Sequence, residues 1–327
     1  MKDSYLLSII IPVYNVEKYI MKCVSSILEQ ILLLQDKDPI EIIIVNDGTK
    51  DNSIKIITDY ISHFDFVKVL NQENRGLSAA RNYGLRNATG KYVWFFDSDD
   101  YLNDNTLGSI VASLKNSSDL HVIGMQSIDE NNKVLESCVF EKVCKPLEFI
   151  KSNKFMAALY IVRRQVLLDN DIFFHEGIYH EDVEFTPRML CYINTYSIIE
   201  KKAYCYLKRL GSITMGNGKD YNPKRANDTF TIVKSLSSFR EKLPFADRKI
   251  FSRIISLIMN NILQDIPNMN ESTMQEVRVL FKNNKGYFIH LLKAFRLKYA
   301  LEWTLFSLFP SKTIEIFSFM KFKKIYK

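Results

Sequence analysis

The sequence has few of the features that mark a secreted, membrane-spanning or zinc-binding protein. Its five cysteines are scattered, odd in number and without a CxxC pair, so we expect neither a zinc site nor a disulfide framework. No apolar run approaches the roughly 18 residues of a membrane span. Residues 1–10 lack the charged start, apolar stretch and cleavage site of a secretory signal. These absences predict a cytoplasmic protein.

Glycine-rich phosphate loops are also missing. Residues 8–20 contain no glycine, and no Walker pattern occurs in the chain. A nucleotide-binding site of this protein must therefore use other residue types.

Acidic residues gather directly after one apolar run. Residues 91–96 are dominated by aromatic and β-branched side chains, which predicts a buried strand. Asp97, Asp99 and Asp100 follow at once. Like charges at a strand end repel one another, so a cation or the solvent must neutralise them. All-oxygen ligands suit Mg²⁺ or Mn²⁺, and Asp97 and Asp99 can face one such ion.

Further strands would bring more polar residues to the same place. Residues 8–15, 41–45 and 66–70 read as short strands, and a helical pattern runs from about residue 17 to 34. Strands that alternate with helices predict an α/β protein with a mostly parallel sheet. Because ligands of such sheets bind at the carboxyl ends of the strands, Asp47 and the acidic cluster should line one crevice.

Five segments in register resemble the family 2 glycosyltransferases, which have the Rossmann-like GT-A fold that binds nucleotide-sugars. The matching segments are residues 8–15, 45–53, 74–84, 96–100 and 179–185. The resemblance covers roughly residues 5 to 215, which implies a catalytic domain over 1–215. A loop-rich joint with Gly211, Gly216, Gly218 and Pro223 follows, so 216–327 is expected as a mainly helical C-terminal region.

The resemblance assigns donor-binding roles to residues of the first three segments. Asp47 would accept a hydrogen bond from the nucleotide base, usually uracil, although the residue before it is Asn46 where the family more often has Asp. Pro12, Tyr14 and Glu17 would form the wall of the base pocket. Arg81 would hold the base or the phosphates, because a guanidinium is a fixed cationic fork.

The acidic segment would carry the metal and the diphosphate. By resemblance, Asp97 faces the ribose or the metal, Ser98 belongs to the donor site, and Asp99 is the direct ligand of Mn²⁺ or Mg²⁺. The ion would offset charge on the departing nucleoside diphosphate. A basic turn near residue 208 resembles the loop at the end of the family's domain, so Lys208 or Arg209 could contact the diphosphate.

A carboxylate in residues 179–185 would act as the general base. In inverting members of the family it deprotonates the acceptor hydroxyl, which requires hydrogen-bond reach. Asp182 is the first choice and Glu181 the second. On a helix, neighbouring residues point about 100° apart, so only one of them should reach the acceptor.

The end of the chain is basic and aromatic. The whole chain has a formal charge of +7, and residues 281–327 hold ten Lys or Arg against Glu302 and Glu315. Basic residues interleaved with aromatics suit an anionic membrane surface. The alternative is a helical subdomain that packs on the catalytic domain. Nucleic acid is not expected as a partner, since no recognition motif accompanies the charge.

Together these features predict an inverting, metal-dependent glycosyltransferase. It would move a sugar from a UDP-sugar to a hydroxyl of a glycan or lipid-linked glycan, peripherally at the inner face of the cytoplasmic membrane. The resemblance implies surface polysaccharide synthesis, such as capsule or lipopolysaccharide. Two alternatives stay open: a sugar-phosphate nucleotidyltransferase, which usually needs the missing glycine-rich loop, and a catalytically inactive nucleotide-sugar-binding scaffold.

Overall fold

The computed structural model describes residues 5–34, 39–152, 154–209, 223–265 and 269–290. The chain forms two compact units. The first unit comprises Met1–Phe149, Asn153–Gly177 and Met189–Arg209; the second comprises Ile150–Ser152, Ile178–Arg188 and Leu210–Lys327. The expected boundary at residue 215 stays a prediction. Residues 178–188, which lie well before it, group with the C-terminal region.

The first unit is built on a nine-stranded sheet with the strand order β3-β2-β1-β4-β8-β6-β9-β5, and β7 pairs with β6. Its strands are β1 (Tyr5–Val13), β2 (Ile40–Asp47), β3 (Val67–Gln72), β4 (Gly90–Phe95), β5 (Tyr101–Leu102), β6 (Leu120–Ile128), β7 (Val134–Cys138), β8 (Tyr160–Arg163) and β9 (Tyr196–Leu207).

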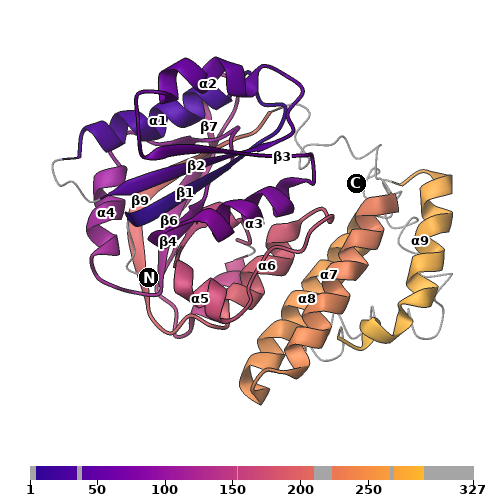
Figure 1. The fold of residues 1–327 in the computed structure, drawn as a ribbon. Coiled ribbons are helices and arrows are strands. Elements are labelled where there is room, and N and C mark those ends of the chain that lie inside the picture. The colour runs from indigo at the N-terminus through magenta and orange to yellow at the C-terminus, as the bar shows by residue number, and fades with distance from the viewer. Residues whose placement is uncertain (1–4, 35–38, 153, 210–222, 266–268, 291–327) are drawn as a thin grey trace. The chain divides into compact units, whose positions relative to one another are not determined.

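The half of the sheet from β3 to β4 is parallel, as the alternation of strands and helices predicts. The central strand β1 is almost continuously apolar because both of its faces are covered, and Ile10 stands between Ile43 of β2 and Phe95 of β4. Figure 1 shows α1 (Ile20–Leu32) and α2 (Ser53–Ile61) on one side of this half and α3 (Leu77–Asn87) on the other.

Helix α3 lies unusually close to the sheet. A Cβ atom added at Gly84 would lie 2.3 Å from Cγ2 of Ile10, so only glycine lets the helix approach β1 this closely. This contact fixes the start of α3 beside the carboxyl end of β2. The remaining helices of the first unit are short: α4 (Leu107–Leu114), α5 (Arg164–Asp169) and η2 (Ala157–Leu159), and η1 (Pro146–Ser152) crosses into the second unit.

The other half of the sheet mixes directions. Strand β8 is antiparallel to β4 and β6, whereas β9 is parallel to β6. The two-residue strand β5 pairs antiparallel with β9, with Tyr101 opposite Cys205. That pairing places the turn of residues 97–100 next to residues 204–209. The site described below depends on it.

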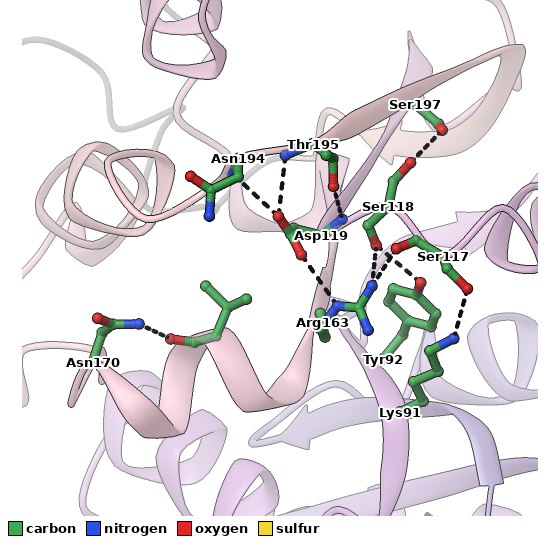
Figure 2. Close-up of polar contacts among 11 residues, drawn as sticks. Lys91, Tyr92, Ser117, Ser118, Asp119, Arg163, Asn170, Asn194, Thr195 and Ser197 are labelled. Carbon is green, nitrogen blue, oxygen red and sulfur yellow. Dashed lines mark hydrogen bonds and ion pairs between the residues drawn. The ribbon is translucent and has the colours of Figure 1, made fainter.

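A polar cluster lies at the other end of β6 and β9, where both strands start. Asp119 lies between Arg163 and the amides of Asn194 and Thr195 (Figure 2). The guanidinium of Arg163 also donates to the backbone carbonyl of Ser117. Each charge in this cluster has a partner within the chain, so its role is to tie β8 to the loops that precede β6 and β9.

The second unit is helical over its described residues, as the sequence predicts. It contains most of α6 (Glu181–Leu190), then α7 (Pro223–Glu241), α8 (Phe245–Asp265), α9 (Glu271–Asn283) and η4 (Lys285–Phe288). Aromatic pairs join α7 to its neighbours. Phe239 stacks on Phe251 of α8 at 5.5 Å, and Phe230 meets Phe281 of α9 edge-on at 5.4 Å.

Among the residues that the structure describes, every helix is too short or too polar to span a bilayer. Most of the basic and aromatic tail predicted to contact membrane, residues 291–327, lies outside the described residues.

Candidate active site

The carboxyl end of β2 presents Asp47, which is only 2% exposed. Its Oδ1 accepts hydrogen bonds from Nε2 of Gln72 at 2.7 Å and from the amide of Arg75 at 2.8 Å. Its Oδ2 accepts from the amide of Gly76 at 2.9 Å. A carboxylate has about four acceptor positions. Asp47 therefore uses three of them for the segment that leads into α3, and the expected contact with a nucleotide base stays a prediction.

The end of β1 and the loop after it contain the other expected base-pocket residues. Pro12 is buried within β1 opposite Val45, and Tyr14 is 40% exposed. The carboxylate of Glu17 accepts from the amide of Asn52 at 3.0 Å, at the start of α2. Tyr14 is thus the member of the predicted wall that presents a ring to solvent.

Asp51, which the sequence analysis did not single out, joins this loop to the loop after β2. It accepts from the amide of Glu17 at 3.0 Å, from the hydroxyl of Thr49 at 2.7 Å and from the amide of Ser53 at 3.0 Å. Burial alone would raise the pKa of Asp51, but the hydrogen bonds from Ser53 and Thr49 outweigh it and lower the pKa to about 2. The ionised Asp51 side chain therefore links the loop after β1 to the loop after β2.

Arg81 of α3 lies beneath the acidic segment and is 1% exposed. Its Nη2 is 2.6 Å from Oδ1 of Asp97, and its guanidinium lies 5.0 Å from the ring centroid of Phe174. The expectation was a direct contact with the donor. That contact stays a prediction. The structure pairs Arg81 with Asp97, so the guanidinium fixes that carboxylate at the carboxyl end of β4.

The next two carboxylates have partners from the end of β9. Nε of Arg209 is 2.9 Å from Oδ2 of Asp99. Asp100 is buried and accepts from the hydroxyl of Tyr204 at 2.5 Å and from the amide of Leu207 at 2.8 Å. Helix α3 therefore holds Asp97, and the end of β9 holds Asp99 and Asp100.

The protonation equilibria reflect this crowding. Burial, followed by the charge of Asp97, raises the pKa of Asp99, and Arg209 opposes the shift. Burial, followed by the charges of Asp99 and Asp97, raises the pKa of Asp100 well above its usual range. Burial and the neighbouring Asp100 raise the pKa of Tyr204 in the same way. The groups around these carboxylates thus do not fully neutralise them, and the site favours the binding of a cation.

Asp97 and Asp99 fit a divalent ion on this observation. Their side chains are 24% and 25% exposed, so both can reach a ligand. No group of three or more His, Cys, Asp or Glu in the described residues is arranged to hold a metal. Mg²⁺, however, is usually held by one or two carboxylates together with substrate phosphates. The donor set therefore suits an ion that arrives with a phosphorylated substrate.

The two candidates of the basic turn behave differently. Lys208 points to the carboxylate of Glu136 on β7 at 3.3 Å, whereas Arg209 reaches Asp99. Ser98, between the two acidic residues, is buried. Of the basic pair, the structure brings only Arg209 to the acidic cluster.

Glu181 and Asp182 belong to the second unit, in the first turn of α6. The residue before them, His180, has a positive φ of 62°, and its Nε2 accepts from Nε of Arg225 on α7 at 2.9 Å. The amide of Tyr179 donates to Asp228 of α7 at 3.0 Å. Helix α7 therefore fixes the backbone that leads into the predicted base.

Burial, followed by the charge of Arg225, lowers the pKa of His180 to about 4, so the ring is neutral at pH 7 and able to accept that bond. Inside α6, Glu184 is buried and accepts from Arg188 and from Ser235 of α7, both at 2.6 Å.

Tyr204 is the residue of the first unit that sequence reasoning missed most clearly. It lies in an ordinary strand pattern, and its carboxylate partner is more than a hundred positions earlier in the chain. No local signal could have found it.

Comparison with known proteins places these residues in context. The sequence model of the family described as Glycosyl transferase family 2 matches residues 8–162. Over 225 residues the chain is 32% identical to the uncharacterized glycosyltransferase EpsJ of Bacillus subtilis, covering 64% of this chain and 63% of EpsJ. It is 31% identical over 204 residues to the poly(ribitol-phosphate) β-N-acetylglucosaminyltransferase TarS of Staphylococcus aureus, covering 61% of this chain and 35% of TarS. The match spans less than two thirds of either relative.

Solved structures show the same fold. The structure of TarS residues 1–349 in complex with UDP-GlcNAc has a TM-score of 0.59 and 22% identity, covering 88% of each chain. The mannosyltransferase PcManGT of Pyrobaculum calidifontis, solved with GDP-Man and Mn²⁺, has a TM-score of 0.52 and 15% identity, covering 96% of this chain and 83% of that one. This likeness confirms the predicted GT-A fold.

Proposed function

The chain carries a glycosyl transferase family 2 domain, and on that premise we propose that it is an enzyme that transfers a sugar from a nucleotide-sugar to a hydroxyl of a glycan. The observation that carries the proposal is the acidic cluster of Asp97, Asp99 and Asp100 at the carboxyl end of β4. Asp47 ends the strand two places along the same sheet. That edge is where α/β sheets bind their ligands.

The donor would lie along this edge. Asp47 has one acceptor position left for a base N–H, and Tyr14 offers an exposed ring for the base to pack on. The donor we propose is a UDP-sugar, which the likeness to TarS supports. UDP-GlcNAc is accordingly the first donor to test.

Asp97 and Asp99 would hold Mn²⁺ or Mg²⁺, which as a Lewis acid would offset charge on the departing diphosphate. Arg81 would hold the Asp97 carboxylate in place for this purpose through their ion pair. Arg209 supplies a second positive charge at the same carboxylates.

Asp182 would be the general base and Glu181 its alternative. In a single displacement, the acceptor oxygen attacks the anomeric carbon while its proton passes to the Asp182 carboxylate. The bond between the anomeric carbon and the diphosphate breaks, and the electron pair leaves with the nucleoside diphosphate. Attack from the opposite face inverts the anomeric centre.

The acceptor we propose is a glycan or lipid-linked glycan of the cell surface. The relative TarS, a poly(ribitol-phosphate) β-N-acetylglucosaminyltransferase, supports a polymeric acceptor. Contact with an anionic membrane through residues 281–327 would bring the enzyme to a lipid-linked acceptor. Flotation with liposomes that contain anionic lipid tests this contact. Replacing Lys321, Lys323 and Lys324 by Glu should reduce recovery in the lipid layer, and equal recovery would count against it.

Release of free nucleoside diphosphate tests the proposed activity. The chain is incubated with a panel of nucleotide-sugars, beginning with UDP-GlcNAc, in the presence of Mn²⁺, Mg²⁺ or EDTA. We expect slow metal-dependent release from one donor and its loss in Asp99→Ala. The exposed variant Asp65→Asn serves as the matched control and should behave as the parent. If no donor is hydrolysed and UDP with Mn²⁺ fails to bind in calorimetry, the proposed activity is wrong.

A further inference from the structure

Arg209 and Asp99 form a close ion pair at the centre of the candidate metal site. Both Nε and Nη2 of Arg209 lie 2.9 Å from the same atom, Oδ2 of Asp99. The side chain of Arg209 is 21% exposed and that of Asp99 25%. The guanidinium thus occupies one oxygen of the carboxylate that the proposed function gives to the metal.

The surroundings fix the backbone of Arg209 but leave its guanidinium able to move. The amide of Lys208, one residue earlier, donates to the carbonyl of Ile128 at 2.8 Å, which fixes the end of β9. The guanidinium lies 4.9 Å from the ring centroid of Tyr19, a contact that tolerates sliding better than a second carboxylate would. A long, flexible side chain on a fixed backbone can swing over several ångströms.

Electrostatics makes the guanidinium and a divalent ion competitors. Two positive charges that share one carboxylate oxygen would lie within a few ångströms of each other. They repel each other at that distance, even at the effective dielectric of about 20 near a protein surface. Asp97 does not relieve this conflict, because Arg81 already neutralises it. A metal ion at Asp99 therefore requires Arg209 to move away.

We propose that Arg209 is a displaceable counter-ion: it neutralises Asp99 in the donor-free protein and moves to the diphosphate when metal and donor bind. The inference rests on the proposed function, because it assumes a metal at Asp99. Arg209 thereby penalises metal binding without a donor and favours metal binding with one. The two ligands become linked through a single side chain.

This arrangement predicts effects of opposite sign for one substitution. Arg209→Ala removes the competitor, so Mn²⁺ alone should bind about fivefold more tightly, as expected for loss of a partly exposed ion pair worth about 1 kcal/mol. The same substitution removes a cation from the diphosphate. UDP in saturating Mn²⁺ should therefore bind about tenfold more weakly, the typical value of one charge-assisted hydrogen bond.

The experiment measures two affinities in the full chain. Electron paramagnetic resonance of free Mn²⁺ gives the affinity for the ion alone, and calorimetry gives the affinity for UDP at saturating Mn²⁺. The variants are Arg209→Ala, Arg209→Gln and Asp99→Ala. Lys208→Ala is the matched control, because Lys208 is the neighbouring cation but pairs with Glu136. Arg209→Gln keeps most of the side chain should the alanine variant fold poorly.

The outcomes separate the inference from its premise. The displaceable counter-ion is supported if both Arg209 variants bind Mn²⁺ more tightly and UDP more weakly, while Lys208→Ala binds both as the parent protein does. Unchanged or weaker Mn²⁺ binding in the Arg209 variants, with loss of binding in Asp99→Ala, overturns it and leaves the proposed metal site intact. A parental Mn²⁺ affinity in Asp99→Ala would show that the metal does not bind to Asp99. Both the proposed metal site and the inference would then be wrong.

Discussion

Nη2 of Arg81 lies 2.6 Å from Oδ1 of Asp97, and the guanidinium is buried while the carboxylate is partly exposed. The pair joins α3, which begins next to the carboxyl end of β2, to the carboxyl end of β4. A cation that the family resemblance assigns to the donor is thus also an internal support of the acidic cluster. Substitutions here should affect stability as well as activity.

Asp97→Asn should lower the free energy of unfolding by about 3 kcal/mol, since it takes the charge partner away from a buried guanidinium. Urea unfolding monitored by fluorescence measures the change. Asp65→Asn, which removes an exposed carboxylate, should change stability by less than about 0.5 kcal/mol. Equal stability of Asp97→Asn and the parent would show that the pair contributes nothing.

Asp182→Asn should lower turnover about a hundred- to ten-thousandfold, the range by which a positioned general base accelerates a reaction. Affinity for UDP with Mn²⁺ should stay as in the parent, because the substitution leaves Asp47, Asp97 and Asp99 in place. Glu181→Gln is the comparison and should retain most of the turnover. If the glutamine variant is the inactive one, the roles of the two residues are reversed; unchanged turnover in Asp182→Asn rejects our assignment.

Glu41→Gln should destabilise the protein without changing activity per folded molecule. The buried carboxylate accepts from the hydroxyl of Ser8 at 2.7 Å, from the amide of Thr89 at 2.6 Å and from Nζ of Lys68 at 2.8 Å. An amide offers one acceptor oxygen and turns a donor toward these groups, at a cost of about 2 kcal/mol. Glu41 is the second residue of β2 and Asp47 is its last, about 20 Å away.

Denaturation and specific activity of the folded fraction measure the two effects of Glu41→Gln. Lys68→Met, which removes the half-exposed partner and leaves the other donors, should cost less than about 1 kcal/mol. A loss of activity in Glu41→Gln at full folding would contradict a purely structural role.

His121 should make the protein less stable in mild acid. Burial, followed by the charges of Arg163 and Lys91, lowers its pKa to about 4. Between pH 6.5 and 4 the unfolded chain therefore takes up a proton that the folded chain refuses, so the free energy of unfolding falls as pH falls. The loss between pH 7 and pH 5 should be about 2 kcal/mol.

Comparison of His121→Gln with the parent isolates this contribution, because other groups titrate in both proteins. The difference in unfolding free energy between pH 7 and pH 5 should be about 2 kcal/mol smaller in the variant. His63→Gln, at an exposed position, should keep the parental pH dependence. A parental pH dependence in His121→Gln as well would show that His121 does not cause the acid sensitivity.

The parallel half of the fold was predictable from the sequence because its strands are local and uniformly apolar. The run of residues 41–45 lies in β2, which ends in Asp47, and the run of 91–96 lies largely in β4, which ends at Phe95, two residues before Asp97. Hydrophobic periodicity and the family resemblance agree there. The positions of Asp47, Asp97 and Asp99 at strand ends follow from that agreement.

The mixed half and the partners of the acidic residues were not predictable. Strand β5 has two residues, too few for a periodic pattern, yet its pairing with β9 decides which residues reach the cluster. The bonds of Asp100 to Tyr204 and Leu207 join positions more than a hundred residues apart. A sequence pattern reports what lies within a turn or a strand, and such partners are set by packing alone.

The long separation between the carboxylates and their partners has a consequence for synthesis. Asp99 and Asp100 leave the ribosome more than a hundred residues before Tyr204, Leu207 and Arg209. At about 5–20 residues per second, the nascent chain spends roughly 5–20 seconds with these carboxylates lacking their native donors. The parallel half can form in that interval, but the acidic turn gains its native partners only once β9 has emerged. The catalytic edge is therefore among the last parts of the first unit to be completed.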